Sequence, residues 1–342
     1  MSKQEPKKHH YIPRFILKNF NNENGQVNYW NIEKDKLEKR NTKSVFMNID
    51  MYRDEFLNHE DPTQIESKLS IFEREIAELI SNKILNKEEI ILDRRELGKL
   101  RIFTALLSFR SNHRMKQYSE NLFDGSTRQI LLKYQPDGNF KELWKREIDD
   151  IATCRCQKDI ENSKTIDPIV KQEFLNSMSC FYMTFVDTQD EEFILTDIYP
   201  TLEVFPIDAN INLHMHYLFP LTPTRMLILN YFVFRNDCWD FPTLKNMMLE
   251  YSQIKGNAII PSINKRTSNH LLNPNDKFIY HVRKICRKDV EYINALFLNE
   301  AKVGFIFRNK NKILNSVISF NNRNDTKQKF ISLEKKINKK NK

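Results

Sequence analysis

Two adjacent histidines near the N-terminus are the residues of this chain best suited to chemistry. The segment Lys7–Phe15 reads KKHHYIPRF and places His9 and His10 between a lysine pair and Pro13. Histidine is the side chain whose ordinary pKa allows proton donation, proton acceptance or metal ligation near neutral pH. On a strand, alternation sends the two rings to opposite faces, so only one would point into a given site. The apolar residues that follow draw this segment toward a core, and a solvated basic terminus is the alternative.

Two carboxylates occupy one side of a predicted helix. Asp61 followed by Pro62 is typical of a helix start, and apolar residues then recur at helical spacing. Within this helix Glu66 and Glu73 are seven residues apart, so they lie on nearly one line, each directly after an apolar core position. They are candidates for general acid, general base or metal ligand, and the alternative is the polar edge of an amphipathic stripe.

An arginine continues the apolar stripe of a second long helix, predicted from about Arg94 to Glu120. Arg110 follows Leu107 by three residues, where another leucine would be expected. A guanidinium that faces inward must meet a carboxylate, backbone carbonyls or a bound anion, because it cannot lose its charge. Arg110, and Arg114 one turn later, are therefore candidate phosphate ligands, with a snorkelling arginine as the alternative.

Asp197 stands at the exit of a strand predicted over 193–196, just before a turn that contains Pro200. Such a position fixes a carboxylate while the loop gives access to a ligand, although aspartate at a turn often only accepts local amide hydrogen bonds. His214 and His216 share a face of a later strand and could chelate a metal. No carboxylate or cysteine lies at a sequence spacing that would complete that set.

The elements that must position these residues change in type along the chain. Short strands and turns are predicted up to about residue 54, and a β-rich region begins at Cys180. Helices are predicted from Asp61, and over about 94–120, 139–151, 168–177 and 288–301, with a last strand over 303–307. This order predicts an α+β fold in which a helical middle packs against a mixed or antiparallel sheet built from N-terminal and C-terminal strands.

One domain is expected over residues 1–320, because the strands predicted near both ends would share that sheet. It would comprise an N-terminal β element at 8–55, the helical middle at 60–178 and a sheet-rich part at 180–310. Residues 321–342 form a lysine-rich tail that could be disordered.

Composition narrows the class of protein. Lys and Arg number 54 against 45 Asp and Glu, a formal net charge of +9 that favours an anionic partner or substrate such as nucleic acid. With 6 glycines and no glycine-rich turn, a phosphate-binding loop is not expected. Five cysteines and no secretory apolar run indicate a cytoplasmic protein, and no segment approaches the roughly 20 apolar residues of a membrane-spanning helix.

Taken together, several short motifs in this order resemble the DUF4238 family, whose activity is unknown. They are Lys8–Phe15 with Leu17 and Phe20, the helix from Ile65 to Glu73, the segment Leu106–Arg114, Thr196–Asp197 before Pro200, Phe219–Pro223 and Ile293–Asn294. The resemblance implies a shared architecture and a common polar site. It also implies that residues far apart in sequence converge there: His9, His10, Glu66, Glu73, Arg110, Asp197 and Asn294.

Imidazole, carboxylate, guanidinium and carboxamide groups are the inventory expected for hydrolysis of phosphodiesters or nucleotides. The leading hypothesis is therefore a nuclease-like or nucleotide-directed hydrolase, one use of which would be defence against foreign genetic elements. The predicted catalytic residues are His9, His10, Glu66, Glu73 and Asp197. The predicted substrate-binding residues are Arg14, Arg110, Arg114 and Asn294. The cofactor is left open, a divalent metal being one option, and no metal ligands are assigned.

Two other classes of function stay open at this point. A non-catalytic module would hold nucleic acid through its basic surface and through Tyr29, Trp30, Tyr52 and Phe56. A toxin-like interaction subunit would need a protein partner to act. A membrane partner is not expected.

Overall fold

A computed structural model describes residues 8–55, 58, 60–208, 212–235, 240–252, 265–266, 273, 275–324, 326 and 328–338. The fold is α+β, as predicted, with helices and mainly antiparallel strands. The chain divides into two compact units whose segments alternate along the sequence. Unit 1 comprises Met1–Pro13, Phe46–Ile84 and Leu92–Ser179, and unit 2 comprises Arg14–Val45, Leu85–Ile91 and Cys180–Lys342.

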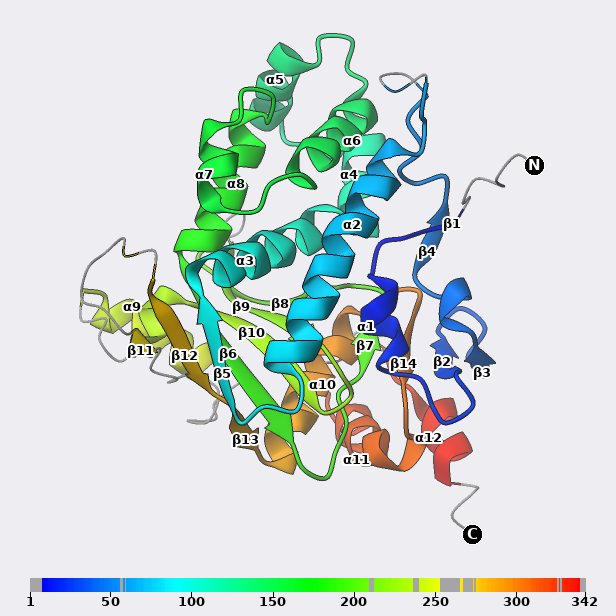
Figure 1. Cartoon of the computed structure of the whole chain (residues 1–342). Helices are drawn as coiled ribbons and strands as arrows, with labels where there is room; N and C mark the ends of the chain where they lie inside the picture. Colours follow the sequence, from blue (N-terminus) through cyan, green and yellow to red (C-terminus); the bar gives the residue numbers. More distant parts are fainter. Residues whose placement is uncertain are drawn as a thin grey trace. The chain divides into compact units, whose positions relative to one another are not determined.

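Unit 1 is mostly helical (Figure 1). Its helices are α2 (Gln64–Leu79), which continues as a π-helical turn (Ile80–Ile84), α3 (Arg94–Phe109), α4 (Asn112–Ser119), α5 (Gly125–Tyr134), α6 (Phe140–Ile151), α7 (Gln157–Asn162) and α8 (Pro168–Ser179). A two-stranded antiparallel sheet joins β1 (Lys8–His10) to β4 (Met47–Ile49). The α2 helix packs against both α3 and α6. The helices predicted from Asp61, over 139–151 and over 168–177 are thereby confirmed.

The core of unit 1 is built from the apolar faces that the sequence pattern indicates. Ile65, Leu69 and Phe72 of α2 are buried, and the Phe72 ring meets Phe103 of α3 edge-on. The α3 helix begins with a capping box, in which the Asp93 carboxylate accepts from the Glu96 amide at 2.8 Å. The contact between Phe72 and Phe103 packs α2 against α3.

The helix predicted over 94–120 is two helices, so that prediction was wrong in its extent. The α3 helix ends at Phe109, Arg110 is its C-cap, and Ser111 leaves the helical conformation with ψ 155°. The Ser111 hydroxyl then accepts from the Arg114 amide at 3.3 Å and caps α4. Serine favours such an N-cap, which is why the chain turns here although the apolar spacing continues.

Unit 2 contains the larger sheets. Strands β6 (Phe181–Thr188), β8 (Thr201–Pro206), β9 (Asn212–Pro220), β10 (Arg225–Tyr231) and β13 (Arg283–Ile285) form a five-stranded sheet in the order β13-β6-β10-β9-β8. A three-stranded sheet has the order β11-β12-β5, from Lys265–Arg266, Lys277–His281 and Glu89–Asp93. All pairs in the five-stranded sheet are antiparallel except β13 with β6.

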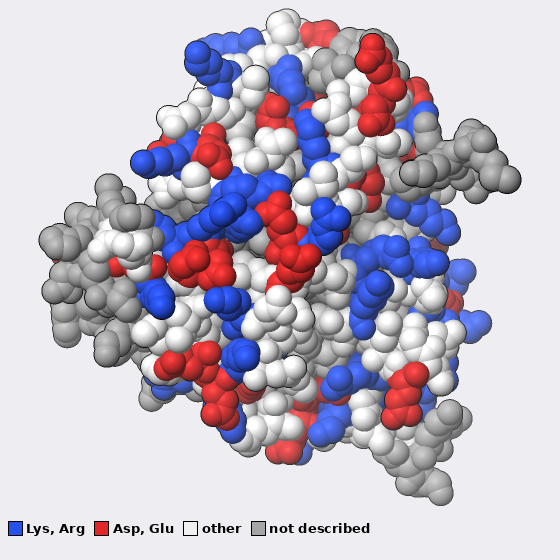
Figure 2. All heavy atoms as spheres, in the orientation of Figure 1, with Lys and Arg blue, Asp and Glu red and all other residues white. Residues whose placement is uncertain are grey.

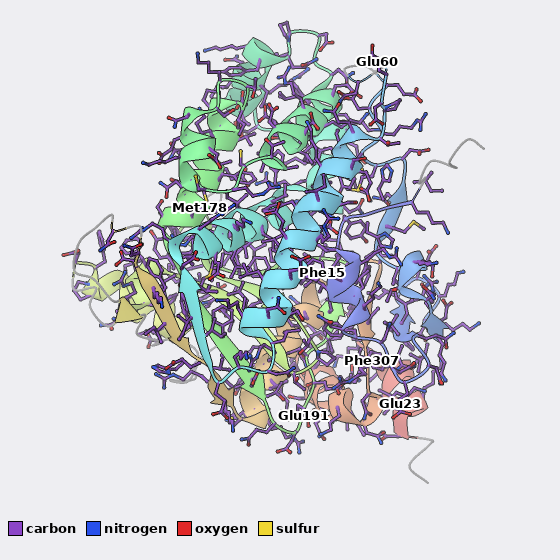
Figure 3. The ribbon with its side chains drawn as sticks, in the orientation of Figure 1. Phe15, Glu23, Glu60, Met178, Glu191 and Phe307 are labelled. Carbon is purple, nitrogen blue, oxygen red and sulfur yellow. The ribbon has the colours of Figure 1, made fainter. Side chains whose placement is uncertain are left out.

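A four-stranded antiparallel sheet joins the two ends of the chain, as predicted. Its order is β3-β2-β14-β7, from Lys36–Arg40, Val27–Asn31, Gly304–Phe307 and Leu195–Thr196. In this sheet Phe305 lies opposite Trp30 on β2 and opposite Thr196 on β7. Phe307, which Figure 3 labels on β14, is fully buried. The apolar strand predicted at 303–307 is therefore a central strand of the sheet.

The remaining elements of unit 2 are short or cover its sheets. They are α1 (Arg14–Lys18), 3-10 turns at Thr42–Ser44 and Phe232–Phe234, α9 (Pro242–Tyr251), α10 (Arg287–Glu300), α11 (Lys310–Asn321) and α12 (Ile331–Asn338). The α12 helix lies within the lysine-rich tail. Leu333 and Ile337 on α12 are buried in the same apolar cluster as Trp30 and Phe305. This part of the tail thus contributes to the core of unit 2.

Candidate functional site

The double histidine lies in the interior of unit 1. In the β1–β4 pair His9 lies opposite Asn48, and His10 lies opposite Met47. His9 is 1% exposed and His10 is 8% exposed. The alternative of a solvated N-terminus is therefore wrong for these two residues, because pairing with β4 holds them inside.

The His9 ring is held in a defined tautomer. Its Nδ1 accepts a hydrogen bond from the Tyr52 backbone amide at 2.8 Å. An accepting nitrogen carries no proton, so the bond assigns the proton of the neutral ring to Nε2. The ring also stacks on Tyr52, with the centroids 5.6 Å apart and the planes inclined by 7°. His9 thus fixes the loop that carries Tyr52.

Tyr52 and Trp144 extend this stack toward α6. Their ring centroids are 5.8 Å apart, and the Trp144 indole donates to the Phe109 carbonyl at 3.0 Å. Tyr52 is fully buried, and burial raises the pKa of its phenol. Tyr52 was predicted as a surface aromatic for nucleic acid, and Trp144 was not predicted at all. Its position on the inner face of a predicted helix was the available signal.

Arg110 joins three segments of the cluster. Its Nη1 lies 2.7 Å from Glu73 Oε1 on α2, and its Nη2 donates to the His10 carbonyl at 2.7 Å. Its Cζ lies 5.7 Å from the centre of the Tyr52 ring. Arg110 is 1% exposed, so its guanidinium does face inward. It contacts two of the three kinds of partner expected from the sequence, a carboxylate and a backbone carbonyl.

The charge of Arg110 is retained in this buried place. Burial by itself would lower the pKa of the guanidinium, but Tyr52, Glu73 and Glu66 together outweigh burial and raise that pKa. A charge this deeply buried is tolerated only because its partners are fixed around it. Arg110 is therefore a permanent positive centre beside two carboxylates.

Glu66 is the group of this cluster that titrates near neutral pH. Burial, and after it the Glu73 carboxylate, raise the pKa of Glu66 to about 7 against the opposing effect of Arg110. Glu66 is only partly buried. None of the residues that the structure describes donates a hydrogen bond to the Glu66 carboxylate, whereas Glu73 is engaged by Arg110. A free carboxyl group with this pKa can exchange a proton at physiological pH.

Arg114 lies in unit 1 with different partners. It forms an ion pair with Glu173 on α8, and its Nη1 donates to Gln117 Oε1 at 2.9 Å. These contacts tie α4 to α8. A role for Arg114 in substrate binding stays a prediction.

Three of the predicted site residues belong to unit 2, where two have structural contacts. Asp197 Oδ1 accepts from the Lys302 amide at 3.0 Å and from the Gly304 amide at 3.3 Å. Burial raises the pKa of Asp197, and these amides oppose the effect. Asp197 thereby joins β7 to β14. Arg14 is the first residue of the short helix α1.

Asn294 is fully buried on α10. Its side-chain oxygen accepts from the Ile194 amide at 3.0 Å, and its Nδ2 donates to the Glu192 carbonyl and to Ser316 Oγ, both at 2.9 Å. Like Asp197, it satisfies backbone groups inside unit 2. The roles of Arg14, Asp197 and Asn294 in a reaction stay predictions.

Two sequence-based expectations about other residues are corrected. Tyr29 and Trp30 are 3% and 0% exposed, so they cannot stack on bases as the binding-module hypothesis required, and Phe56 lies outside the described residues. His216 does have a nearby carboxylate, because Glu203 lies opposite it across β8 and β9, with Nε2 and Oε2 3.8 Å apart. Register across strands, which sequence spacing does not reveal, brings them together.

The described residues also bear on metals and membranes. Within the described ranges, no group of three or more His, Cys, Asp or Glu side chains is placed to hold a metal ion. Among the helices that the structure describes, none is both long enough and apolar enough to cross a membrane.

The fold and this cluster define an α+β protein with an interior histidine pair, a buried arginine–glutamate ion pair and a partly exposed glutamate. The chain belongs to the DUF4238 family of proteins of unknown function, whose family model matches residues 8–312. Comparison with curated proteins and with solved structures gave no match. The family assignment confirms the resemblance drawn from the HHYIP segment.

Proposed function

We propose that this protein hydrolyses phosphodiester bonds, as a nuclease-like or nucleotide-directed enzyme, and that Glu66 is its proton-transfer residue. The observation that supports this most is the free Glu66 carboxyl group, with a pKa of about 7, beside the Glu73–Arg110 ion pair. The net charge of +9 favours an anionic substrate. Defence against foreign genetic elements is the biological setting proposed for this activity.

In the proposed reaction, ionised Glu66 accepts a proton from water, and the resulting hydroxide attacks phosphorus. The bond from phosphorus to the leaving oxygen breaks, and His10 supplies the proton that this oxygen requires. Arg110 contributes by its fixed positive charge and by holding Glu73, which leaves Glu66 free. His9 acts as a positioning residue, because its Nδ1 is engaged by Tyr52.

A non-catalytic nucleic-acid-binding module is less well supported. The aromatic side chains that it would use, Tyr29, Trp30 and Tyr52, are buried. On the face drawn in Figure 2, Lys and Arg side chains lie next to Asp and Glu side chains over much of the surface. Such mixing weakens the attraction for a long polyanion compared with a continuous basic stripe.

The test is turnover by matched variants of α2. Purified protein is incubated with DNA, RNA, nucleotides and an activated phosphodiester, with and without Mg²⁺, Mn²⁺ or Zn²⁺. We expect hydrolysis that Glu66→Gln reduces about a hundredfold or more, the usual contribution of a general base, while Glu78→Gln on the exposed face of α2 leaves it unchanged. Absence of turnover by the unaltered protein on every substrate, or equal turnover by Glu66→Gln, would contradict the proposal.

A further inference from the structure

A second feature of unit 1 is a cavity of about 490 Å³ between α6 and the loop that follows β4. It is lined by Asp50, Arg53 and Glu55 from the loop and by Lys141, Glu142 and Lys145 from α6. Its size is within the range of pockets that hold small organic ligands. The hydrolytic chemistry proposed above uses none of these side chains.

Lys145 and Glu142 give this cavity a paired donor and acceptor. Lys145 Nζ lies 2.9 Å from Glu142 Oε1, and the two side chains are only 7% and 14% exposed. An ammonium group has three N–H donors, so Lys145 retains donors beyond the one used for Glu142. Glu142 Oε2 is buried, and no donor among the described residues reaches it. A buried carboxylate oxygen without a donor is costly, so this pair is suited to a ligand that supplies one.

The ligand that complements this pair carries an acceptor next to a donor. A keto oxygen would accept from Lys145, and an adjacent ring N–H would donate to Glu142. Guanine, hypoxanthine, uracil and thymine present this keto–imino edge, whereas adenine and cytosine do not have a ring N–H beside a keto oxygen. Proteins read exposed bases through hydrogen bonds to such edges. The rest of the lining is mixed in charge: Arg53 is ion-paired with Glu55 at 2.7 Å, and Asp50 and Lys141 complete it.

The cavity adjoins the Glu66 cluster through shared residues. Asp50 and Arg53 flank Tyr52 in sequence, and Lys145 directly follows Trp144. Tyr52 in turn stacks on Trp144 and on His9 and lies 5.7 Å from the Arg110 Cζ. An ion pair between Lys68 on α2 and Asp149 on α6, 2.7 Å long, holds the two helices that carry Glu66 and Lys145.

We propose that the Lys145–Glu142 pair is a recognition site for nucleobases with a keto–imino edge. This inference rests on the proposed function, because it names the class of nucleotide on which that activity would act.

The test is equilibrium binding of mononucleotides to the full chain by calorimetry. We expect GMP, IMP and UMP to bind about tenfold or more tightly than AMP and CMP, the discrimination typical of a paired base contact. Lys145→Met and Glu142→Met should lose this preference, whereas Lys133→Met, an exposed lysine on α5, should retain it. Equal binding of GMP and AMP, no binding of any nucleotide, or full GMP affinity in Lys145→Met would overturn the inference.

Two further measurements separate this inference from the proposed function. Glu78→Gln should bind GMP as the unaltered protein does, because Glu78 is exposed on α2 and does not line the cavity. Selective binding without hydrolysis would leave the recognition site standing and refute the hydrolase. Hydrolysis with equal affinity for guanine and adenine substrates would support the hydrolase and refute the recognition site. The nucleotide panel on the unaltered protein decides the matter even if a cavity variant fails to fold.

Discussion

At the scale of single residues, the cluster depends on two glutamates that look equivalent in the sequence but have different partners in the structure. Glu66 and Glu73 occupy the same stripe of α2, but Glu73 is engaged by Arg110 and Glu66 is not. The difference leaves Glu66 able to exchange a proton near pH 7. Similar divisions of labour between neighbouring carboxylates occur at catalytic sites.

The raised pKa of Glu66 predicts a pH-dependent cost to stability. Because the pKa rises from 4.5 to about 7 on folding, the folded state binds the proton more tightly between these values. The stabilisation is full below pH 4.5 and is lost as the pH rises through 7. We expect Glu66→Gln to be about 3 kcal/mol more stable relative to the unaltered protein at pH 8 than at pH 4.5, measured by urea unfolding. Glu78→Gln is the control, and an equal pH response of both variants would disprove the assignment.

The buried ion pair predicts strong coupling between Arg110 and Glu73. Arg110→Met should cost about 3–5 kcal/mol of unfolding free energy, because it leaves a carboxylate beside Glu66 without its counter-charge. Adding Glu73→Gln to Arg110→Met should restore part of that loss. A double-mutant cycle by urea unfolding measures the coupling. Additive effects of the two substitutions would show that the pair does not act as a unit.

The members of this cluster are easier to predict from the sequence than the contacts between them. An inward arginine without an obvious partner was recognisable from the stripe ending at Leu107, and its need for a carboxylate followed from charge alone. The Tyr52 amide as the partner of His9 could not be predicted, because that contact joins residues 43 positions apart. Long-range backbone contacts leave no periodic signal in the sequence.

At the scale of elements, local capping residues determine where a helix ends when the apolar periodicity alone does not. The α6 helix follows the predicted pattern, whereas the pattern over 94–120 continues across Ser111 although the helix does not. The break has a consequence for the site, since it makes Arg110 the C-cap of α3 rather than a residue within a helix. From this position its side chain reaches both α2 and β1.

A polar row across β8, β9 and β10 predicts sensitivity to acid in unit 2. His216 lies opposite Glu203 and Asn230, and its Nδ1 is 2.9 Å from Asn230 Oδ1. Burial lowers the pKa of His216 from 6.5 to about 4, so the unfolded chain binds the proton first. The stabilisation is full above pH 6.5 and is lost as the pH falls through 4.

We expect this residue to contribute about 3 kcal/mol to the fall in unfolding free energy between pH 6.5 and 4. His216→Gln should flatten that fall, and His281→Gln, on the exposed end of β12, should not. Thermal and urea unfolding over this pH range provide the measurement. An acid response of His216→Gln identical to that of the unaltered protein would contradict the interpretation.

At the scale of the whole molecule, the order of elements predicted the class of fold but not the division of the chain. The strand at 303–307 was expected to share a sheet with the N-terminal strands, and β14 does pair with β2. The division at Pro13, which places His10 in unit 1 and Arg14 in unit 2, had no signal in the sequence. It depends on which surfaces each short segment buries, and that is a property of the folded chain.

The most direct test of the proposed hydrolase is the pH dependence of kcat/KM for an activated phosphodiester. If Glu66 is the base, the acid side of the kcat/KM profile should rise about tenfold per pH unit up to an apparent pKa near 7. Glu66→Gln should remove this rise, and Glu78→Gln should keep it. A profile that is flat from pH 5 to 9, or one that Glu66→Gln leaves unchanged, would contradict the assignment of Glu66 as the proton-transfer residue.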